Sequence, residues 1–284
     1  MSAALSLPAV RVAEGAARRP RVFGSRVRRS AVGVVAIAAG IGIWYAVTYL
    51  VLSPERRFLL PAPHVVLTES LLVPSHLAPM LTALGVTVRV AAVGFVLAIV
   101  IGVAIGALMS QAWWLERAIF PYAVVLQVVP ILAITPLIGL WFGFSSTSRV
   151  AVCVMIALFP IITNTHFGFR SVDPGLHELF TLGRASRLQR LVRLELPAAL
   201  PSILTGLRIS SGQVVIGAII GDMFFAQGQP GIGTLMDDYR AQLRSTDLIA
   251  AIVLAALFGV VVFAGCSLVS RLAVGRWHTS GGTR

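Results

Sequence analysis

Residues 173–201 read DPGLHELFTLGRASRLQRLVRLELPAALP, a charged and helix-prone stretch between two long apolar runs. Four arginines recur at every third position, as Arg184, Arg187, Arg190 and Arg193. Gly183 interrupts the helical pattern, because glycine weakens a helix interior. We interpret this stretch as a structured polar segment at one face of a membrane, a placement typical of a docking site for a soluble partner.

The composition of the whole chain supports a membrane location. Of 284 residues, 57% are hydrophobic and 12% are charged, and the mean hydropathy is +0.89. Soluble domains carry about 25% charged residues. The sequence therefore predicts an all-α membrane protein, a bundle of about six transmembrane helices. The formal charge of +12 lies mostly in tails and loops, so no nucleic-acid partner is predicted.

The absence of lysine excludes several chemistries. All 23 basic residues are arginine, whereas a P-loop needs a lysine at the phosphates and Schiff-base catalysis needs a lysine amine. No H-E-x-x-H or G-x-S-x-G motif occurs, and the five histidines are scattered. We therefore expect no catalytic residue, no metal site and no cofactor in this chain. Cys153 and Cys266 fall in apolar runs and are interpreted as packing residues.

Six uncharged or nearly uncharged runs are predicted to span the membrane, since about 20 apolar residues cross the hydrocarbon core. They cover residues 31–52, 90–109, 118–144, 150–169, 198–221 and 248–270. Residues 1–30 hold seven arginines and are interpreted as a disordered basic tail. The expected organisation is this tail, a transmembrane domain at 31–275 with a cytoplasmic loop at 170–197, and a second tail at 276–284.

The arginines also predict an orientation, because positive charge is concentrated on cytoplasmic loops. With the N-terminus inside, sixteen arginines lie on the inner side and five on the outer side. Both termini and the segment 173–201 are therefore expected in the cytoplasm. The loops 53–80 and 223–247 then face outward, either as plain connections or as contacts for an outer partner.

Polar groups and prolines inside the predicted spans mark a candidate translocation pathway. Proline leaves backbone carbonyls without a helical partner, and in lipid these must find another one. Intramembrane polar side chains are costly and usually face the bundle interior. The candidate pathway residues are Gln127, Pro130, Pro136, Asn164 and Gln213. The alternative for the proline-rich span is a kinked packing helix.

Three further features of the spans receive structural interpretations. Arg208 is expected to reach inward to water or to pair with an acid of the segment. Asp222, at the outer end of its span, is expected to be interfacial. The small-residue repeats at 102–106 and 217–221 predict close helix packing.

The segment 173–201 resembles the EAA loop of permease subunits of binding-protein-dependent ABC importers. Glu178 and Gly183 have the family's spacing, and the Leu-Pro ending falls at Leu196-Pro197. The two alanines of the family pattern are replaced by Leu179 and Phe180. The resemblance covers about residues 40–275, and the runs FPIITNT at 159–165 and LPAALP at 196–201 are similar to the sulfonate, taurine and nitrate group.

This resemblance implies two short cytoplasmic helices, bent at Gly183, that seat in a groove of an ATP-binding subunit. The implied docking residues are Glu178, Leu179, Phe180, Gly183, Arg187, Leu191, Leu196 and Pro197. From the residues themselves, Leu188, Leu191 and Val192 form an apolar stripe at helical spacing.

The resemblance also implies a multi-pass location in a bacterial inner membrane and transport by alternating access. The implied partners are an ABC ATP-binding subunit that binds ATP–Mg, an extracytoplasmic substrate-binding protein and a second copy of the permease. The substrate is expected to be a sulfonate-, taurine- or nitrate-like anion, or a vitamin precursor such as riboflavin or the thiamine pyrimidine. The alternative is an ion-gradient-driven secondary transporter, which would favour internal repeats and mid-membrane carboxylates.

Overall fold

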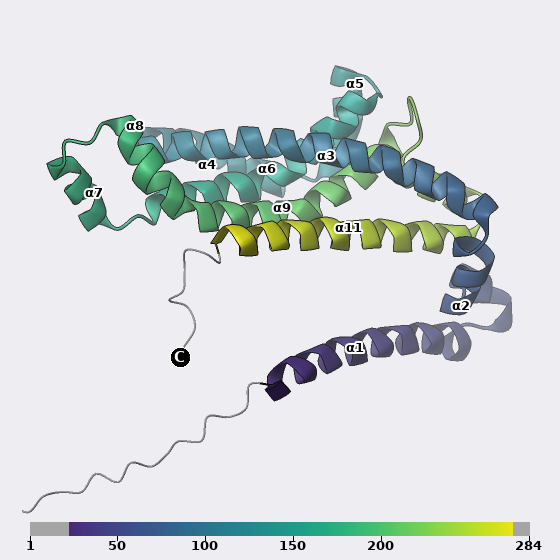
Figure 1. Ribbon diagram of the computed structural model, residues 1–284. Helices are drawn as coiled ribbons and strands as arrows, with labels where there is room; N and C mark the ends of the chain where they lie inside the picture. Colours follow the sequence, from purple (N-terminus) through teal and green to yellow (C-terminus); the bar gives the residue numbers. More distant parts are fainter. Residues whose placement is uncertain (1–22, 275–284) are drawn as a thin grey trace, which may run out of the picture. The chain divides into compact units, whose positions relative to one another are not determined.

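The computed structural model describes residues 23–274, with side chains described from residue 33 onward. The tail at 276–284 and most of the tail at 1–30 lie outside the described residues. Within the described part, every regular element is a helix or a helical turn (Figure 1). This confirms the all-α prediction.

The chain divides into two units, residues 1–54 and 55–284. The first unit holds α1 (Phe23–Ala46), which continues into the π-helical turn η1 (Val47–Val51). Residues 33–51 are long and apolar enough to cross a membrane, which agrees with the first predicted span.

The second unit contains the remaining elements. It holds η2 (Pro54–Leu59), α2 (Pro63–Val66), η3 (Leu67–Leu71), α3 (Pro74–Gln111), α4 (Trp113–Val128), α5 (Ile131–Phe142), α6 (Ser146–Arg170), α7 (Pro174–Leu182), α8 (Arg187–Arg190), η4 (Leu191–Glu195), α9 (Leu196–Phe224), α10 (Ile232–Ala241) and α11 (Ser245–Val274). The long helices α3, α6, α9 and α11 run side by side (Figure 1).

The centre of the second unit is α6, which packs between α3 and α9. Glycines allow this close approach. A Cβ atom at Gly102 would lie 2.8 Å from Ile161, and one at Gly217 would lie 3.0 Å from Cys153. Cys153 is fully buried in the cluster that joins the three helices. The small-residue packing faces and the packing role of Cys153 are therefore confirmed.

Helix α3 is longer than the sequence predicted. It begins at Pro74, sixteen residues before the predicted span at 90–109. Proline is tolerated at the first position of a helix because its missing N–H would have no partner there. Pro79 also lies within the helix. Helix α3 therefore begins within the stretch 53–80 that was predicted to form an outer loop.

The predicted third span, 118–144, is not a continuous helix. It divides into α4 and α5, whose axes differ by 105°. Pro130 has no N–H to continue α4, and it biases the preceding residue toward an extended backbone. Val129 accordingly has φ −65° and ψ 126°. We call the break at residues 128–131 the elbow.

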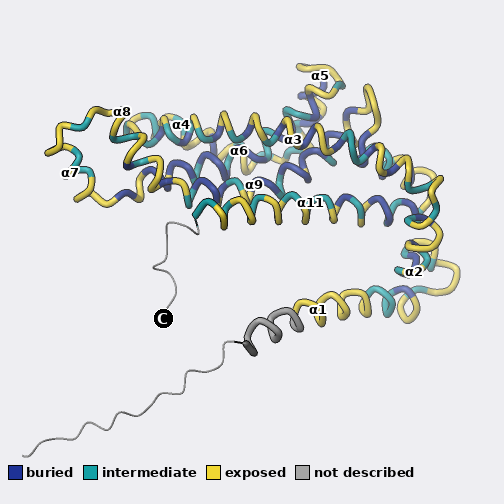
Figure 2. The backbone as a smooth tube through the Cα atoms, viewed as in Figure 1, coloured by how far each residue is buried: buried dark blue, intermediate teal, exposed yellow. Residues whose placement is uncertain are grey.

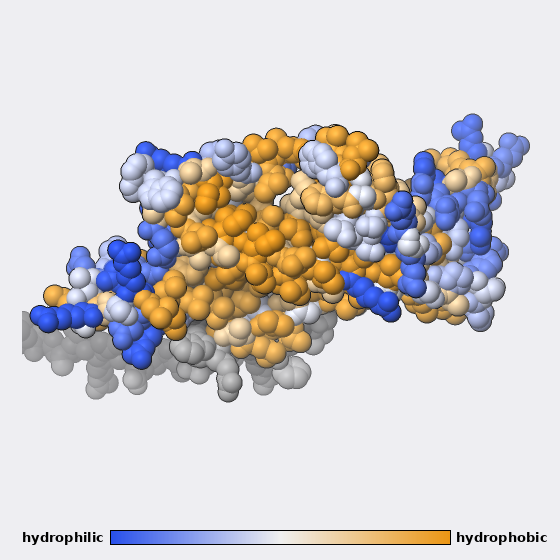
Figure 3. Space-filling model, turned by 90° about the horizontal axis from the view of Figure 1, so that it is seen from above, coloured by the Kyte–Doolittle hydropathy of each residue, from blue (hydrophilic) through white to orange (hydrophobic). Residues whose placement is uncertain are grey.

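The other predicted spans are confirmed with longer ends, as α6, α9 and α11. Five helices of the described residues can cross a membrane, or six spans if the bent pair counts as one. The face shown in Figure 3 is apolar across its middle and hydrophilic toward both ends. This distribution matches a chain that crosses a bilayer.

Candidate functional site

The segment between α6 and α9 forms two short helices with defined N-terminal caps. Asp173 caps α7, since its Oδ1 accepts a hydrogen bond from the Gly175 N–H at 2.7 Å. Ser186 and Gln189 form a capping box at the start of α8. Each cap satisfies backbone donors that a helix start leaves free. The local sequence therefore specifies both helix starts. We call residues 173–197 the arginine-rich segment.

The break between α7 and α8 depends on Arg184, which corrects the prediction for Gly183. Gly183 has an ordinary φ of −73°, and a Cβ atom there would make only van der Waals contacts. Arg184 has φ +51°. The N–H of Ala185 bonds the Phe180 carbonyl, and the N–H of Arg184 bonds the Thr181 carbonyl. This is a Schellman ending with arginine in the left-handed position that glycine usually takes.

Beyond the break, α8 continues through the wide turn η4 into α9 without interruption. The Leu196 N–H bonds the Leu191 carbonyl across this turn. Leu191 packs against the buried cluster of Phe169, Ala199 and Ile203. The structure therefore places Leu191 against the bundle, where it anchors the segment, and not beside Leu188 and Val192 on an outward face.

Leucine and valine side chains of the segment are exposed on α7, α8 and η4. The exposed fraction is 60% for Leu179, 83% for Leu182 and 69% for Leu188. Figure 2 shows much of α7 in the colour of exposed residues. Leu176 and Val192 are also exposed. Exposed apolar side chains gathered on one segment mark an interaction surface.

The remaining predicted docking residues lie around this surface. Glu178 is exposed and Phe180 is half-buried. Arg187 lines a polar cavity of about 580 Å³ beneath the segment. Leu196 and Pro197 line an apolar groove of about 490 Å³ beside the C-terminal end of α11. The predicted residues thus belong to one segment but face several directions.

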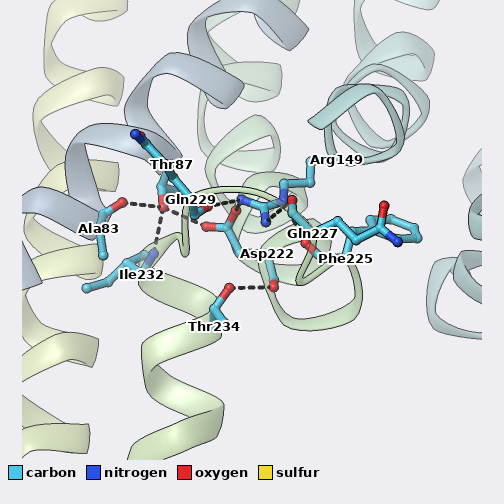
Figure 4. Close-up of polar contacts among 9 residues, drawn as sticks. All are labelled: Ala83, Thr87, Arg149, Asp222, Phe225, Gln227, Gln229, Ile232 and Thr234. Atoms are coloured by element: carbon cyan, nitrogen blue, oxygen red, sulfur yellow. Dashed lines mark hydrogen bonds and ion pairs between the residues drawn. The ribbon is translucent and has the colours of Figure 1, made fainter. Parts of the chain in front are cut away.

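At the other end of α6 and α9, a buried arginine organises a polar cluster (Figure 4). Arg149 is 1% exposed. Its Nη1 lies 3.2 Å from Asp222 Oδ1 and 3.0 Å from the Gln229 carbonyl. Its Nε donates to the Phe225 carbonyl at 2.8 Å and its Nη2 to the Gln227 carbonyl at 3.2 Å. The guanidinium therefore fixes the loop that follows α9. We call these residues the Arg149 cluster.

Asp222 completes the cluster from α9. Its Oδ2 accepts a hydrogen bond from the Thr87 hydroxyl of α3 at 2.6 Å, and that hydroxyl oxygen accepts the Ile232 N–H at 2.8 Å. A Cβ atom at Gly231 would collide with the Asp222 carboxylate, and one at Gly233 would collide with the backbone of α9. Helices α3, α6 and α9 and the loop before α10 are thereby tied together.

Sequence reasoning missed this cluster. Asp222 was expected only to be interfacial; it lies near the end of α9 and is fully buried, where it pairs with Arg149. Arg149 was counted only as an outer-loop charge. The usable signal was one arginine at the start of an apolar span and one aspartate at the end of another, in a chain with few charges. The loop predicted at 223–247 contains the short helix α10.

A second carboxylate ties α11 to the segment before α3. Asp247 Oδ1 accepts the Ser70 hydroxyl at 2.6 Å and lies 2.9 Å from His76 Nδ1. Its Oδ2 accepts from Arg244 Nε at 2.9 Å. Arg208 is exposed, and its guanidinium lies over the Phe263 ring at 5.7 Å.

Two of the predicted pathway residues line one pocket. Gln127 of α4 and Gln213 of α9 both border a pocket of about 240 Å³ beside the elbow. Pro130 makes the elbow, whereas Pro136 lies inside α5. Asn164 donates to the Pro160 carbonyl at 2.8 Å and packs against a glycine of α9. The structure thus brings Gln127 and Gln213 together, and it gives Asn164 a helix-packing contact.

The sequence matches the family "Binding-protein-dependent transport system inner membrane component" over residues 94–276. This match covers more than half of the chain. The chain belongs to this family of ABC importer permeases.

Similar proteins include transport permeases named for different substrates. The formylaminopyrimidine transport permease ThiX of Halalkalibacterium halodurans is 35% identical over 74% of this chain and 82% of its own length. The riboflavin transport permease RibX of Chloroflexus aurantiacus is 32% identical, over 81% and 84%. The putative aliphatic sulfonates permease SsuC of Bacillus subtilis is 31% identical, over 87% and 88%.

The fold is also similar to a chain of the inward-facing MetNI methionine ABC transporter. The TM-score is 0.60 at 16% sequence identity, and the match covers 71% of this chain and 99% of that chain. The helical bundle therefore has the fold of a known ABC transporter permease. Together with the family match, this makes the chain a multi-pass transport subunit for small solutes.

Proposed function

We propose that this permease takes a small solute from an extracytoplasmic binding protein and releases it into the cytoplasm by alternating access. A separate ATP-binding subunit supplies the energy and docks on the arginine-rich segment. The observation that carries this proposal is the set of exposed leucines on α7 and α8, two helices with capped N-termini between α6 and α9.

The chain contains no lysine, so it lacks the P-loop residue that contacts nucleotide phosphates. ATP–Mg is therefore bound by the partner. The arginine count favours a cytoplasmic position for the segment and for both termini. A homodimer is the expected assembly, and the loop fixed by the Arg149 cluster is the candidate contact for the binding protein.

The substrate range follows from the similar proteins. These proteins are named for a formylaminopyrimidine, riboflavin and aliphatic sulfonates. We propose that the substrate is a small solute comparable in size to these. The alternative, a secondary transporter, lacks support because the carboxylates of the described spanning helices, Glu116, Asp222 and Asp247, lie near helix ends and not at mid-span.

The first test is reconstitution of the full-length chain in liposomes with and without its ATP-binding subunit. Uptake that requires both the subunit and ATP is expected. Uptake driven by an ion gradient in the absence of that subunit would contradict the proposal.

Two substitutions test the docking role of the segment. Gly183→Pro removes the N–H that bonds the Leu179 carbonyl at 3.0 Å, and Glu178→Arg reverses an exposed charge. Both variants are expected to keep a folded bundle but to uncouple ATP hydrolysis from uptake. Normal uptake in both variants would remove the docking assignment.

A further inference from the structure

The pocket at the elbow has an unusual composition for a transport pathway. It lies between α4, the start of α5, α6 and α9, and holds about 240 Å³. None of its lining side chains is ionisable, and its two polar side chains are the carboxamides of Gln127 and Gln213. The rest of the wall is apolar and includes Phe159 and Met155.

The side-chain oxygen of Gln213 can accept a hydrogen bond from a ligand. Its Oε1 atom is buried and has no hydrogen-bond partner among the described residues. A buried polar atom without a partner costs free energy, so such atoms usually bind water or a ligand. A ligand that donates an N–H or O–H group would satisfy it.

The elbow adds backbone groups of both kinds. Pro130 has no N–H to give to the Leu126 carbonyl, so the last carbonyls of α4 lack helical donors. The first N–H groups of α5, beginning at Ile131, lack helical acceptors because no turn of the same helix precedes them. Leu126 and Ile131 both line the pocket. The C-terminal end of α4 carries a partial negative charge and the N-terminal end of α5 a partial positive charge. Together the two helix ends therefore favour neither an anion nor a cation.

These features disfavour an anion. Moving an anion into an apolar site is costly unless a cation or several donors compensate. Arg89 does not serve this pocket, since it lines a separate cavity of about 540 Å³ with Ser146 and Thr147. The small volume suits one ring better than a large ligand.

We propose that the elbow pocket binds a neutral, single-ring heterocycle with an amino donor beside a ring acceptor, and that it selects this class over sulfonates and nitrate. Only the role of the pocket in the translocation pathway rests on the proposed transport function. The binding itself concerns this chain alone.

The test uses the full-length chain in lipid nanodiscs and ligand-observed saturation-transfer NMR. The probes are an aminopyrimidine, a methylpyrimidine without the amino group, and an alkanesulfonate. The aminopyrimidine is expected to bind, the methylpyrimidine to bind about fivefold to tenfold more weakly for the loss of a hydrogen bond, and the sulfonate not to bind.

Variants assign the binding to the pocket. Gln213→Leu and Gln127→Leu are each expected to weaken aminopyrimidine binding by about fivefold or more. Gln127 is exposed at the elbow, so its substitution should leave folding intact. Gln242→Leu is the matched control, because Gln242 is an exposed carboxamide outside the pocket.

Two results would overturn the proposal. One is aminopyrimidine binding that is absent, or equal in the wild type and both pocket variants. The other is sulfonate binding that Gln213→Leu abolishes and Arg89→Gln preserves, since this would place the sulfonate in the elbow pocket. The assay contains no ATP-binding subunit, so its outcome is separate from that of the liposome test of the proposed function.

Discussion

The Arg149 cluster and the arginine-rich segment lie at opposite ends of α6 and α9 and use arginine in opposite ways. Arg149 is buried, and its guanidinium donates to one carboxylate and three carbonyls. The segment instead exposes Arg184, Arg187 and Arg193 next to exposed leucines. The Arg149 guanidinium therefore finds its partners within the chain, whereas the arginine-rich segment presents a surface that a partner can cover.

The largest expected effect comes from breaking the complete region. Asp222→Ala leaves the buried Arg149 guanidinium without its countercharge, which typically costs about 3–5 kcal/mol. The free energy of unfolding is expected to fall by that amount, measured by thermal or denaturant unfolding in detergent.

The matched control is Asp237→Ala. Asp237 pairs with Arg240 on the exposed side of α10, and such pairs contribute about 0–1 kcal/mol. Equal destabilisation by the two substitutions would show that the Arg149 cluster is not a structural lock.

A smaller loss is expected from Gly231→Ala. The added methyl group would collide with the Asp222 carboxylate, and overpacking of this kind costs about 1–3 kcal/mol. Gly212→Ala serves as the control, since a Cβ atom there meets nothing within 4 Å. If both variants unfold at the same temperature, the close approach at Gly231 does not matter for stability.

The smallest effect is expected at the helix ending in the arginine-rich segment. Arg184→Gly relieves a left-handed backbone at φ +51°, which should stabilise the end of α7 by up to about 1 kcal/mol. Gly183→Ala should be near neutral. Amide hydrogen exchange of α7 measures both variants, and slower exchange is expected in Arg184→Gly. Slower exchange in Gly183→Ala alone would show that the strain does not lie at Arg184.

The spans could be predicted from sequence because long apolar runs carry the signal directly. Uncharged runs located α6, α9 and α11 to within about four residues at each end. The elbow could not be placed, because proline is compatible with a kinked helix and with a broken one. Packing around Ile138 and Phe225 accompanies the broken form, and no local pattern encodes that packing.

The same limit applies to the sites. The spacing of Glu178, Gly183 and Pro197 located the arginine-rich segment, since it is local in sequence. The direction of Leu191 was missed because it depends on contacts with α6 and α9. The Arg149–Asp222 pair joins residues far apart in the chain, so periodicity within one helix could not reveal it.

We propose that the exposed leucines of α7 receive the ATP-binding subunit. The most direct measurement is co-purification of that subunit with Leu179→Glu and Leu182→Glu variants of the full-length permease, since a charge at a buried contact abolishes docking. Both variants are expected to lose the ATP-binding subunit during purification. Their unfolding temperature is expected to stay unchanged, because both side chains are exposed. Full retention of the subunit by both variants would contradict the proposal.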